Sequence, residues 1–421
     1  MNFVKKPKVL LAVVAVMSCN VFYEAPVSAL ELFNEPGLLA VLRKNQVLSA
    51  RDVEAIKNEY PKYEINGNLQ FQYVYADADI AASKVNEINF RRANLSFVGR
   101  VSEKFSVVIE PEFGKGQSAL RDAFIAYRSP NFGIFAGNHS SAFGAEAMKN
   151  DINLRFVERN LTSNISPGRM LGVSVITSLL DNKIKAQAGV WNSTISSKSE
   201  AGLINNLLSD KQIFGVNSEV LAKNIFVQAA RIGFSTNGYK DFYSSGGGFT
   251  GDENFNHEFG VDVGASYYNS SAATDASTPG STSLNGANAF GADAAFKFWR
   301  FTGEVEYAKR NLQWWQYNAL SGSVPVDSAQ TSYSAQASFL LSDNLSLAVR
   351  QESFVYDSSG KVLKGVYGQD QDSWTTAGLT YFSKEQNTKI QMNYVMKSET
   401  FSNGLSDPKN NTVLIQATSY F

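Results

Sequence analysis

The sequence is poor in cysteine, histidine and proline, and long hydrophobic runs are rare in it. Its 421 residues include one Cys, 2 His and 10 Pro. The cysteine, Cys19, lies in an N-terminal segment that we expect to be removed, so the mature chain would form no disulfide. After residue 29 no apolar run approaches the roughly 20 residues that a membrane-spanning helix needs. The sequence therefore excludes a disulfide-stabilised domain and a helical membrane protein.

Neither sign of charge dominates the chain. Residues 1–29 show Lys5, Lys6 and Lys8, then an apolar run over 9–17, then small residues at 27 and 29, the pattern of a signal peptide cleaved after Ala29. The alternative is a lipoprotein processing box ending at Cys19. Without residues 1–29, 35 basic residues stand against 38 acidic ones, a formal charge of −3. This balance excludes the basic surface of a nucleic-acid-binding protein.

Residues 30–61 contain the only clear helical pattern after the signal peptide. Leu38, Leu39 and Leu42 fit a short apolar helix face, and Ser49 with Asp52 three positions later is typical of a second helix start. We expect a short N-terminal helical segment in the periplasm, which either plugs a channel or contacts other subunits. The alternative is a leader that packs on nothing.

From residue 62 to residue 421 the pattern changes to strands. In the stretch 88–113, apolar and polar residues alternate on both sides of a short polar link, which predicts a two-stranded ribbon with one apolar face. Similar alternation recurs in about seventeen segments. They lie near residues 64–75, 88–100, 104–114, 119–129, 132–138, 169–179, 183–192, 211–220, 224–234, 257–268, 287–298, 300–310, 331–341, 345–356, 373–383, 388–399 and 411–421.

Short connections alternate with long polar ones, as is typical of outer-membrane barrels. A barrel with both ends in the periplasm needs an even number of strands, so one segment between 211 and 268 is surplus. The sequence thus predicts an all-β protein, a 16-stranded antiparallel transmembrane β-barrel over 62–421. The apolar strand faces, for example Val261, Val263 and Leu347, would face lipid. The polar faces would line a water-filled lumen, because barrels of this size are too wide for side chains to fill.

Several short motifs resemble those of the phosphate-selective porin O/P family of Gram-negative outer membranes. They are Phe90-Arg91-Arg92-Ala93, Leu120-x-Asp122-Ala123-Phe124-Ile125, Phe143-Gly144-x-Glu146, Phe156-Val157-Glu158-Arg159, Pro167-Gly168-Arg169-x-Leu171-Gly172-Val173, Phe290-Gly-Ala-Asp293 and Gly303-Glu-Val-Glu306-Tyr307. The resemblance spans most of the mature chain. It implies an outer-membrane homotrimer of 16-stranded channels for small hydrophilic solutes. In each channel an inward-folded third loop, here about residues 139–168, would narrow the pore.

The resemblance also implies a path for anions such as phosphate. The cations expected along it are Arg92, Lys149, Arg155, Arg159, Arg169, Lys183 and Lys185. Fixed cations replace part of an anion's hydration and raise its local concentration. Arg91 and Arg92 are adjacent in a strand, so we expect only Arg92 to face the lumen. For Arg92 the alternative is a stiffening ion pair with Glu110 or Glu112.

Acidic residues in the same loop, Glu146, Asp151 and Glu158, make a general porin with mild selectivity an equal expectation. No catalytic site, cofactor or metal is expected: His139 and His257 lack a nucleophile motif, and the Asp77-x-Asp79 and Asp370-x-Asp372 pairs lack calcium-loop spacing. The alternative function is a barrel that serves mainly as a surface adhesin or structural anchor.

Overall fold

The computed structural model describes residues 61–76, 85–114, 118–192, 226–239, 259–271, 282–318, 322–357, 369–383, 387–401 and 411–421. The expected signal peptide and nearly all of the helical leader lie outside these ranges. So do His257, Asp77, Asp79 and the segment 211–220. Among the described residues, no helix is long and apolar enough to cross a membrane.

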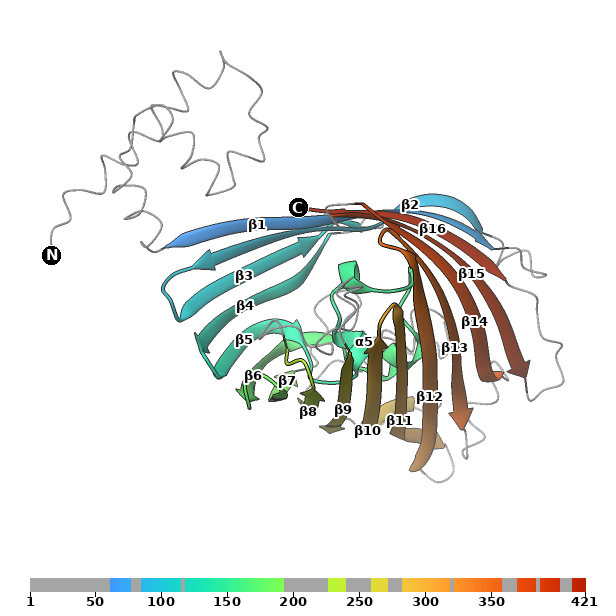
Figure 1. Ribbon diagram of the computed structural model, residues 1–421. Helices are drawn as coiled ribbons and strands as arrows, with labels where there is room; N and C mark the ends of the chain where they lie inside the picture. Colours follow the sequence, from blue (N-terminus) through green and yellow to red (C-terminus); the bar gives the residue numbers. More distant parts are fainter. Residues whose placement is uncertain are drawn as a thin grey trace, which may run out of the picture.

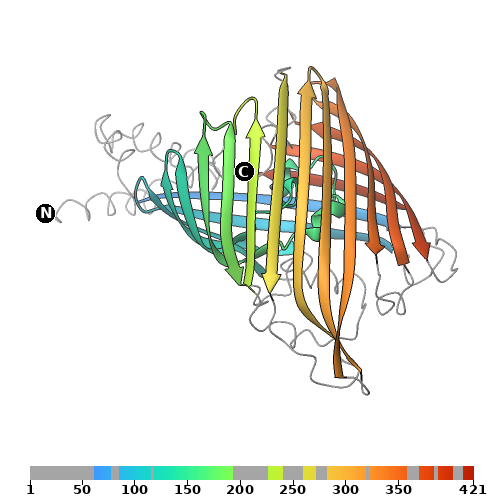
Figure 2. The same ribbon diagram turned by 90° about the horizontal axis from the view of Figure 1, so that it is seen from below.

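Sixteen antiparallel strands form a closed ring, because β1 pairs with β16 (Figures 1 and 2). The strands are β1 (Lys62–Ala76), β2 (Val85–Arg100), β3 (Phe105–Glu112), β4 (Ala119–Ser129), β5 (Phe132–Ser140), β6 (Arg169–Leu179), β7 (Ile184–Asn192), β8 (Phe226–Ser235), β9 (Gly260–Ser271), β10 (Thr282–Phe298), β11 (Phe301–Asn318), β12 (Gly322–Ser342), β13 (Leu345–Asp357), β14 (Gln369–Phe382), β15 (Thr388–Phe401) and β16 (Thr412–Tyr420). The predicted strand number is confirmed.

Each strand alternates between the inside and the outside of the ring. In β8, burial and exposure alternate at every residue, with Arg231 turned inward and Ile232 outward. The predicted lipid-facing residues Val263 and Leu347 behave in the same way, because both are exposed on the outer face. Because successive side chains in a regular strand point to opposite faces, the strand pairing register determines which side chains face the lumen.

Most connections at one end of the barrel are tight, and the turn between β10 and β11 contains only Trp299 and Arg300. Trp299 in that turn and residues 180–182 between β6 and β7 adopt positive φ angles. The connection from β8 to β9 lies at the same end but spans 236–259, so short turns are not uniform there. At the opposite end β11 and β12, with 18 and 21 residues, extend past their neighbours (Figure 2).

Gly137 in β5 explains one close approach in the wall. Its φ is +138°, and a Cβ atom there would lie 2.2 Å from the carbonyl oxygen of Ala123 in β4. Only glycine fits both the angle and the space.

Candidate functional site

The chain between β5 and β6, residues 141–168, lies within the ring of strands (Figure 1). It contains the short helix α5 (Ala145–Met148) and two 3₁₀ turns, η3 (Asp151–Asn153) and η4 (Leu161–Ile165). The Ser141 N–H donates to the Gly168 carbonyl at 2.9 Å, which joins the two ends of the segment. We call residues 141–168 the inner segment.

Apolar side chains hold the inner segment against one side of the wall. The ring of Phe143 packs edge-on against Tyr268 of β9, with centroids 5.0 Å apart, and both are fully buried. The Tyr268 hydroxyl donates to the Ile165 carbonyl at 3.2 Å. Leu161 and Ile165 belong to the same buried cluster, which includes residues of β6 to β11 and of β13. Burial of each large apolar side chain contributes roughly 1.5–3 kcal/mol to the free energy that holds the inner segment against the wall.

Two acidic residues of β11 bind polar groups of the inner segment. Glu304 accepts from Lys149 Nζ at 2.7 Å and pairs with Arg155 Nη2 at 3.0 Å. Glu306 accepts from the side-chain amide of Asn160 at 2.9 Å. Burial disfavours the charged form of Lys149, but the nearby carboxylates outweigh burial and raise its pKa above the usual value. The lysine is therefore held as a cation.

Further hydrogen bonds join the middle of the inner segment to β13 and β15. The Val157 N–H donates to Asn393 Oδ1 at 2.7 Å, and Lys389 Nζ donates to the Leu154 carbonyl at 2.7 Å. Arg350 lies over the Phe156 ring, 4.6 Å from its centroid, and donates to the Glu158 carbonyl at 3.0 Å. The backbone of the segment is thus fixed by side chains of the wall.

On the other side of the barrel, three arginines converge on Asp151. The distances from its carboxylate are 3.3 Å to Arg92 of β2, 2.5 Å to Arg121 of β4 and 2.6 Å to Arg159 of the inner segment. Asp151 is only 2% exposed. Burial opposes its ionisation, but the arginine charges outweigh burial and hold its pKa well below the usual range. This group of four residues is called the Asp151 cluster below.

Arg91 departs from the expectation that it points away from the lumen. It binds Glu158 of the inner segment through two hydrogen bonds of 2.8 and 2.9 Å. The β1–β2 register shifts between Gln70 and Phe71, which pair with Arg92 and Phe90, so Arg91 is the extra residue of a β-bulge. A bulge breaks the strict alternation of a strand. Both arginines can therefore reach the inner segment, and the prediction for Arg91 was wrong.

The predicted cations do not form one group. Arg92, Lys149, Arg155 and Arg159 lie on or against the inner segment, each beside a carboxylate. Arg169 pairs with Asp122 of β4 at 3.1 Å. The buried Lys185 of β7 lies 5.5 Å from the centroid of the Tyr239 ring, whereas Lys183 is exposed in the turn before β7. Lys183 lies apart from the others.

Two acidic wall residues and one arginine were absent from the predicted set: Glu304, Glu306 and Arg121. Their signal was present in the sequence, because Glu304 and Glu306 are two residues apart in a predicted strand and so share the face of the lumen. Arg121 occupies the corresponding inward position in β4, where it is buried.

His139 is buried at the end of β5. One ring nitrogen lies 2.8 Å from Ser174 Oγ and the other 2.9 Å from the Gly137 carbonyl, and the ring packs on Trp191. These contacts describe a histidine that fills the wall. Among the residues that the structure describes, no group of three His, Cys, Asp or Glu side chains could hold a metal ion.

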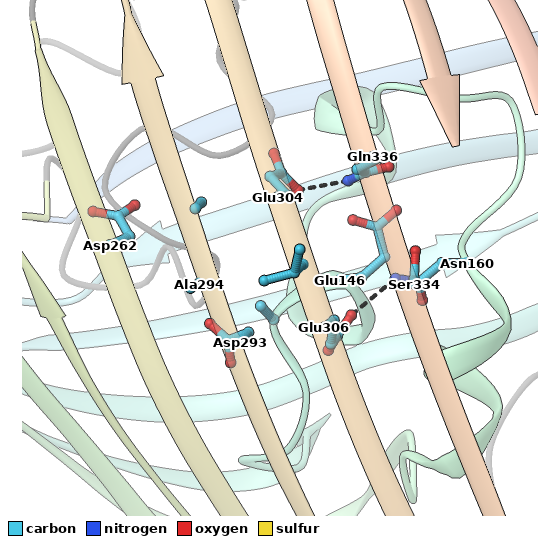
Figure 3. A pocket seen from close by; sticks show the side chains of 12 residues that line it. Glu146, Asn160, Asp262, Asp293, Ala294, Glu304, Glu306, Ser334 and Gln336 are labelled. Carbon is cyan, nitrogen blue, oxygen red and sulfur yellow. Dashed lines mark hydrogen bonds between the residues drawn. The ribbon is translucent and has the colours of Figure 1, made fainter. Parts of the chain in front are cut away.

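A small pocket lies between α5 and the wall (Figure 3). Its lining residues come from α5, from Asn160 and from β9 to β12. They are Ala145, Glu146, Asn160, Asp262, Asp293, Ala294, Ala295, Glu304, Val305, Glu306, Ser334 and Gln336. Five of these side chains are carboxylates and none is basic.

Comparison with known proteins agrees with this architecture. Residues 64–206 match the family model described as phosphate-selective porin O and P. The predicted porin resemblance is confirmed. The matched range begins in β1 and includes the whole inner segment, and it places this porin-like barrel in the outer membrane. No curated protein matches the chain.

Solved structures share the fold of this porin-like barrel at low sequence identity. The outer-membrane channel DcaP of Acinetobacter baumannii is 12% identical, with 86% of this chain and 97% of that chain covered and a TM-score of 0.54. OmpT of Vibrio cholerae, in a structure titled as a trimer form, is 10% identical, with 86% and 100% covered and a TM-score of 0.51. The anion-selective porin of Comamonas acidovorans is 9% identical, with 86% and 100% covered and a TM-score of 0.50.

Proposed function

We propose that the protein is a passive, non-enzymatic channel for small hydrophilic solutes in the Gram-negative outer membrane. The observation that carries this proposal is the polarity of the wall. Charged and amide side chains face the inside of a closed 16-stranded ring, while large apolar side chains are exposed outside. A ring of this strand number encloses a lumen wide enough for water.

The inner segment is the proposed inward-folded third loop that narrows this channel. Its attachments to β2 and β4 on one side and to β11 and β13 on the other support this assignment. A segment held at both sides occupies part of the cross-section. Solutes would therefore pass beside a fixed constriction whose lining charges act at short range.

A mild preference for anions is part of the proposal. In the Asp151 cluster three guanidinium groups share one carboxylate, so the cluster carries excess positive charge. In a narrow passage with low-dielectric walls such an excess attracts anions. Phosphate is the anion that the family description names.

A homotrimer is the proposed assembly. Support comes from the fold shared with OmpT of Vibrio cholerae, for which a trimer form has been solved. Cross-linking of the protein in outer membranes, followed by denaturing electrophoresis, would show a species of three chains; a monomer alone would contradict this assembly.

The test is the reversal potential of the purified protein in a planar bilayer under a tenfold gradient of KCl. We expect discrete conductance steps and an anion-selective potential, reduced by adding phosphate and weakened in Arg92→Gln and Arg159→Gln. The matched control is Arg300→Gln, which removes an arginine from an exposed turn at the barrel end. Equal potentials in all variants would refute the assigned anion path. Absence of conductance would refute the channel and favour a barrel that anchors surface loops.

A further inference from the structure

The carboxylates of the pocket in Figure 3 differ in how they are paired. Three cations bind three of its carboxylates. Lys149 lies 2.8 Å from Glu146 and 2.7 Å from Glu304, Arg155 also pairs with Glu304, and Arg231 binds Asp293 at 2.5 and 2.8 Å. Glu306, only 9% exposed, has the amide of Asn160 as its hydrogen-bond donor and no ion-pair partner among the described residues. Glu306 is therefore a buried carboxylate without a cation beside it in the described part of the chain.

Several buried oxygen atoms in the pocket accept no hydrogen bond from the described part of the chain, and three of them belong to residues that lie close together in Figure 3. They are Glu146 Oε1, Ser334 Oγ and Gln336 Oε1, in residues that are 3%, 3% and 6% exposed. Figure 3 shows Glu146 between Gln336 and Ser334, with Glu306 nearby. Buried acceptors are almost always satisfied, so acceptors that converge on one pocket indicate a donor from outside the protein.

The oxygen atoms restrict the chemistry of that donor. A metal ion held directly by carboxylates is disfavoured, because no described group of three acidic, His or Cys side chains has the required spacing. A primary ammonium group brings one positive charge and three N–H donors that can be directed at separate oxygen atoms. Charge-assisted hydrogen bonds of this kind are about twice as strong as neutral ones.

We propose that this pocket is a binding subsite for the primary ammonium group of a solute, held by Glu306 and Glu146 with Ser334 and Gln336. The proposal rests on the proposed channel function, since a solute must enter the lumen to reach it. It adds a cation-accepting subsite to a lumen that also contains the arginine-rich Asp151 cluster. The preferred solutes would then include amines, beside the simple anions expected from the family description.

The experiment compares two cations of equal charge in a planar bilayer at pH 8. n-Butylammonium has three N–H donors, and tetramethylammonium, which also has four carbon atoms, has none. We expect n-butylammonium to block the channel at concentrations at least tenfold lower than tetramethylammonium. Equal block by the two ions would show only a diffuse negative field and would overturn the proposal.

Variants locate the block. Glu306→Gln and Ser334→Ala are expected to weaken n-butylammonium block by about tenfold and about threefold. Their matched controls are Glu64→Gln in β1, where the carboxylate is partly exposed and pairs with Arg100, and Ser106→Ala in β3; both residues lie outside the pocket. Block that weakens equally in the controls would overturn the proposal.

Calorimetric titration of n-butylammonium into the folded protein in detergent tests the ammonium subsite separately from the channel function. Saturable binding that is lost in Glu306→Gln supports the subsite even if no conductance is found, in which case only the channel function fails. Conductance without such binding refutes the subsite and leaves the channel intact.

Discussion

Replacement of Asp151 by Asn tests how the inner segment is held. The substitution keeps the shape of the side chain but removes the one carboxylate to which Arg92, Arg121 and Arg159 are joined at 3.3, 2.5 and 2.6 Å. Removing one partner of a buried ion pair costs about 3–5 kcal/mol. Arg121 keeps a second pairing with Glu110 at 3.5 Å, so we take the lower end, about 3 kcal/mol. Local opening of the segment should become on the order of 100-fold more frequent.

Limited trypsin digestion of the intact folded barrel measures this opening, because the opened segment exposes cleavage sites after Lys149, Arg155 and Arg159. Asp151→Asn should be cleaved there far faster than the original protein, and its channel should become more anion-selective. The matched control is Asp343→Asn, whose carboxylate lies in a turn with the side chain 77% exposed and pairs with Arg300 at 3.5 Å. Exposed pairs contribute at most about 1 kcal/mol. If Asp151→Asn resisted trypsin as well as this control, the cluster would not hold the segment.

Further predictions concern pH, backbone space and the second anchor. The depressed pKa of Asp151 means that its stabilising effect is complete above the unfolded value of about 3.9 and is lost as the pH falls through the folded value. The raised pKa of Lys149 means that its effect is present below about 10.4 and is lost as the pH rises through the folded value. Titration of these two groups should therefore cause no step in the hydrogen-exchange protection of the inner segment between about pH 5 and pH 9. A step in that window that disappears in Asp151→Asn would contradict the assignment. Gly137→Ala should lower the yield of folded barrel in refolding gels, because the new Cβ would collide with the Ala123 carbonyl, and unchanged yield would show that β4 and β5 can separate. Glu304→Gln should increase current noise in single-channel records, because Lys149 loses one of its two carboxylates, and quiet records would count against this anchor.

Much of the wall could be predicted from the sequence, because strand alternation has a fixed period. Val263 and Leu347 were placed on the outer face from the alternation of apolar and polar residues alone, and both are exposed in the structure. The alternation of faces predicted the wrong side for Arg91, because the bulge that turns Arg91 inward depends on the pairing of β1 with β2. Pairing between strands is a tertiary property that composition and spacing of one strand do not specify.

The candidate site was predictable in part. The cations of the inner segment were identified, but their partners were not, because an irregular loop has no period from which contacts follow. In the sequence, Asp151 was one of the acidic residues that weakened the expectation of anion selectivity. In the structure, its carboxylate forms ion pairs with three arginines. Glu304 and Glu306 lie more than 140 positions from the residues of the inner segment that they bind, so only the closed ring brings these groups together.

The inner segment also has a mechanical consequence. In a closed ring of strands, each strand is hydrogen-bonded only to its two neighbours. Such a ring resists stretching, but it can be flattened into an oval with little loss of free energy. The inner segment spans this ring from Arg92 in β2 to Glu304 in β11, with a further attachment at Asn393 in β15, and so acts as a cross-brace. Lateral pressure from the bilayer therefore acts on the inner segment as well as on the ring of strands, and the width of the passage depends on the shape of the whole barrel.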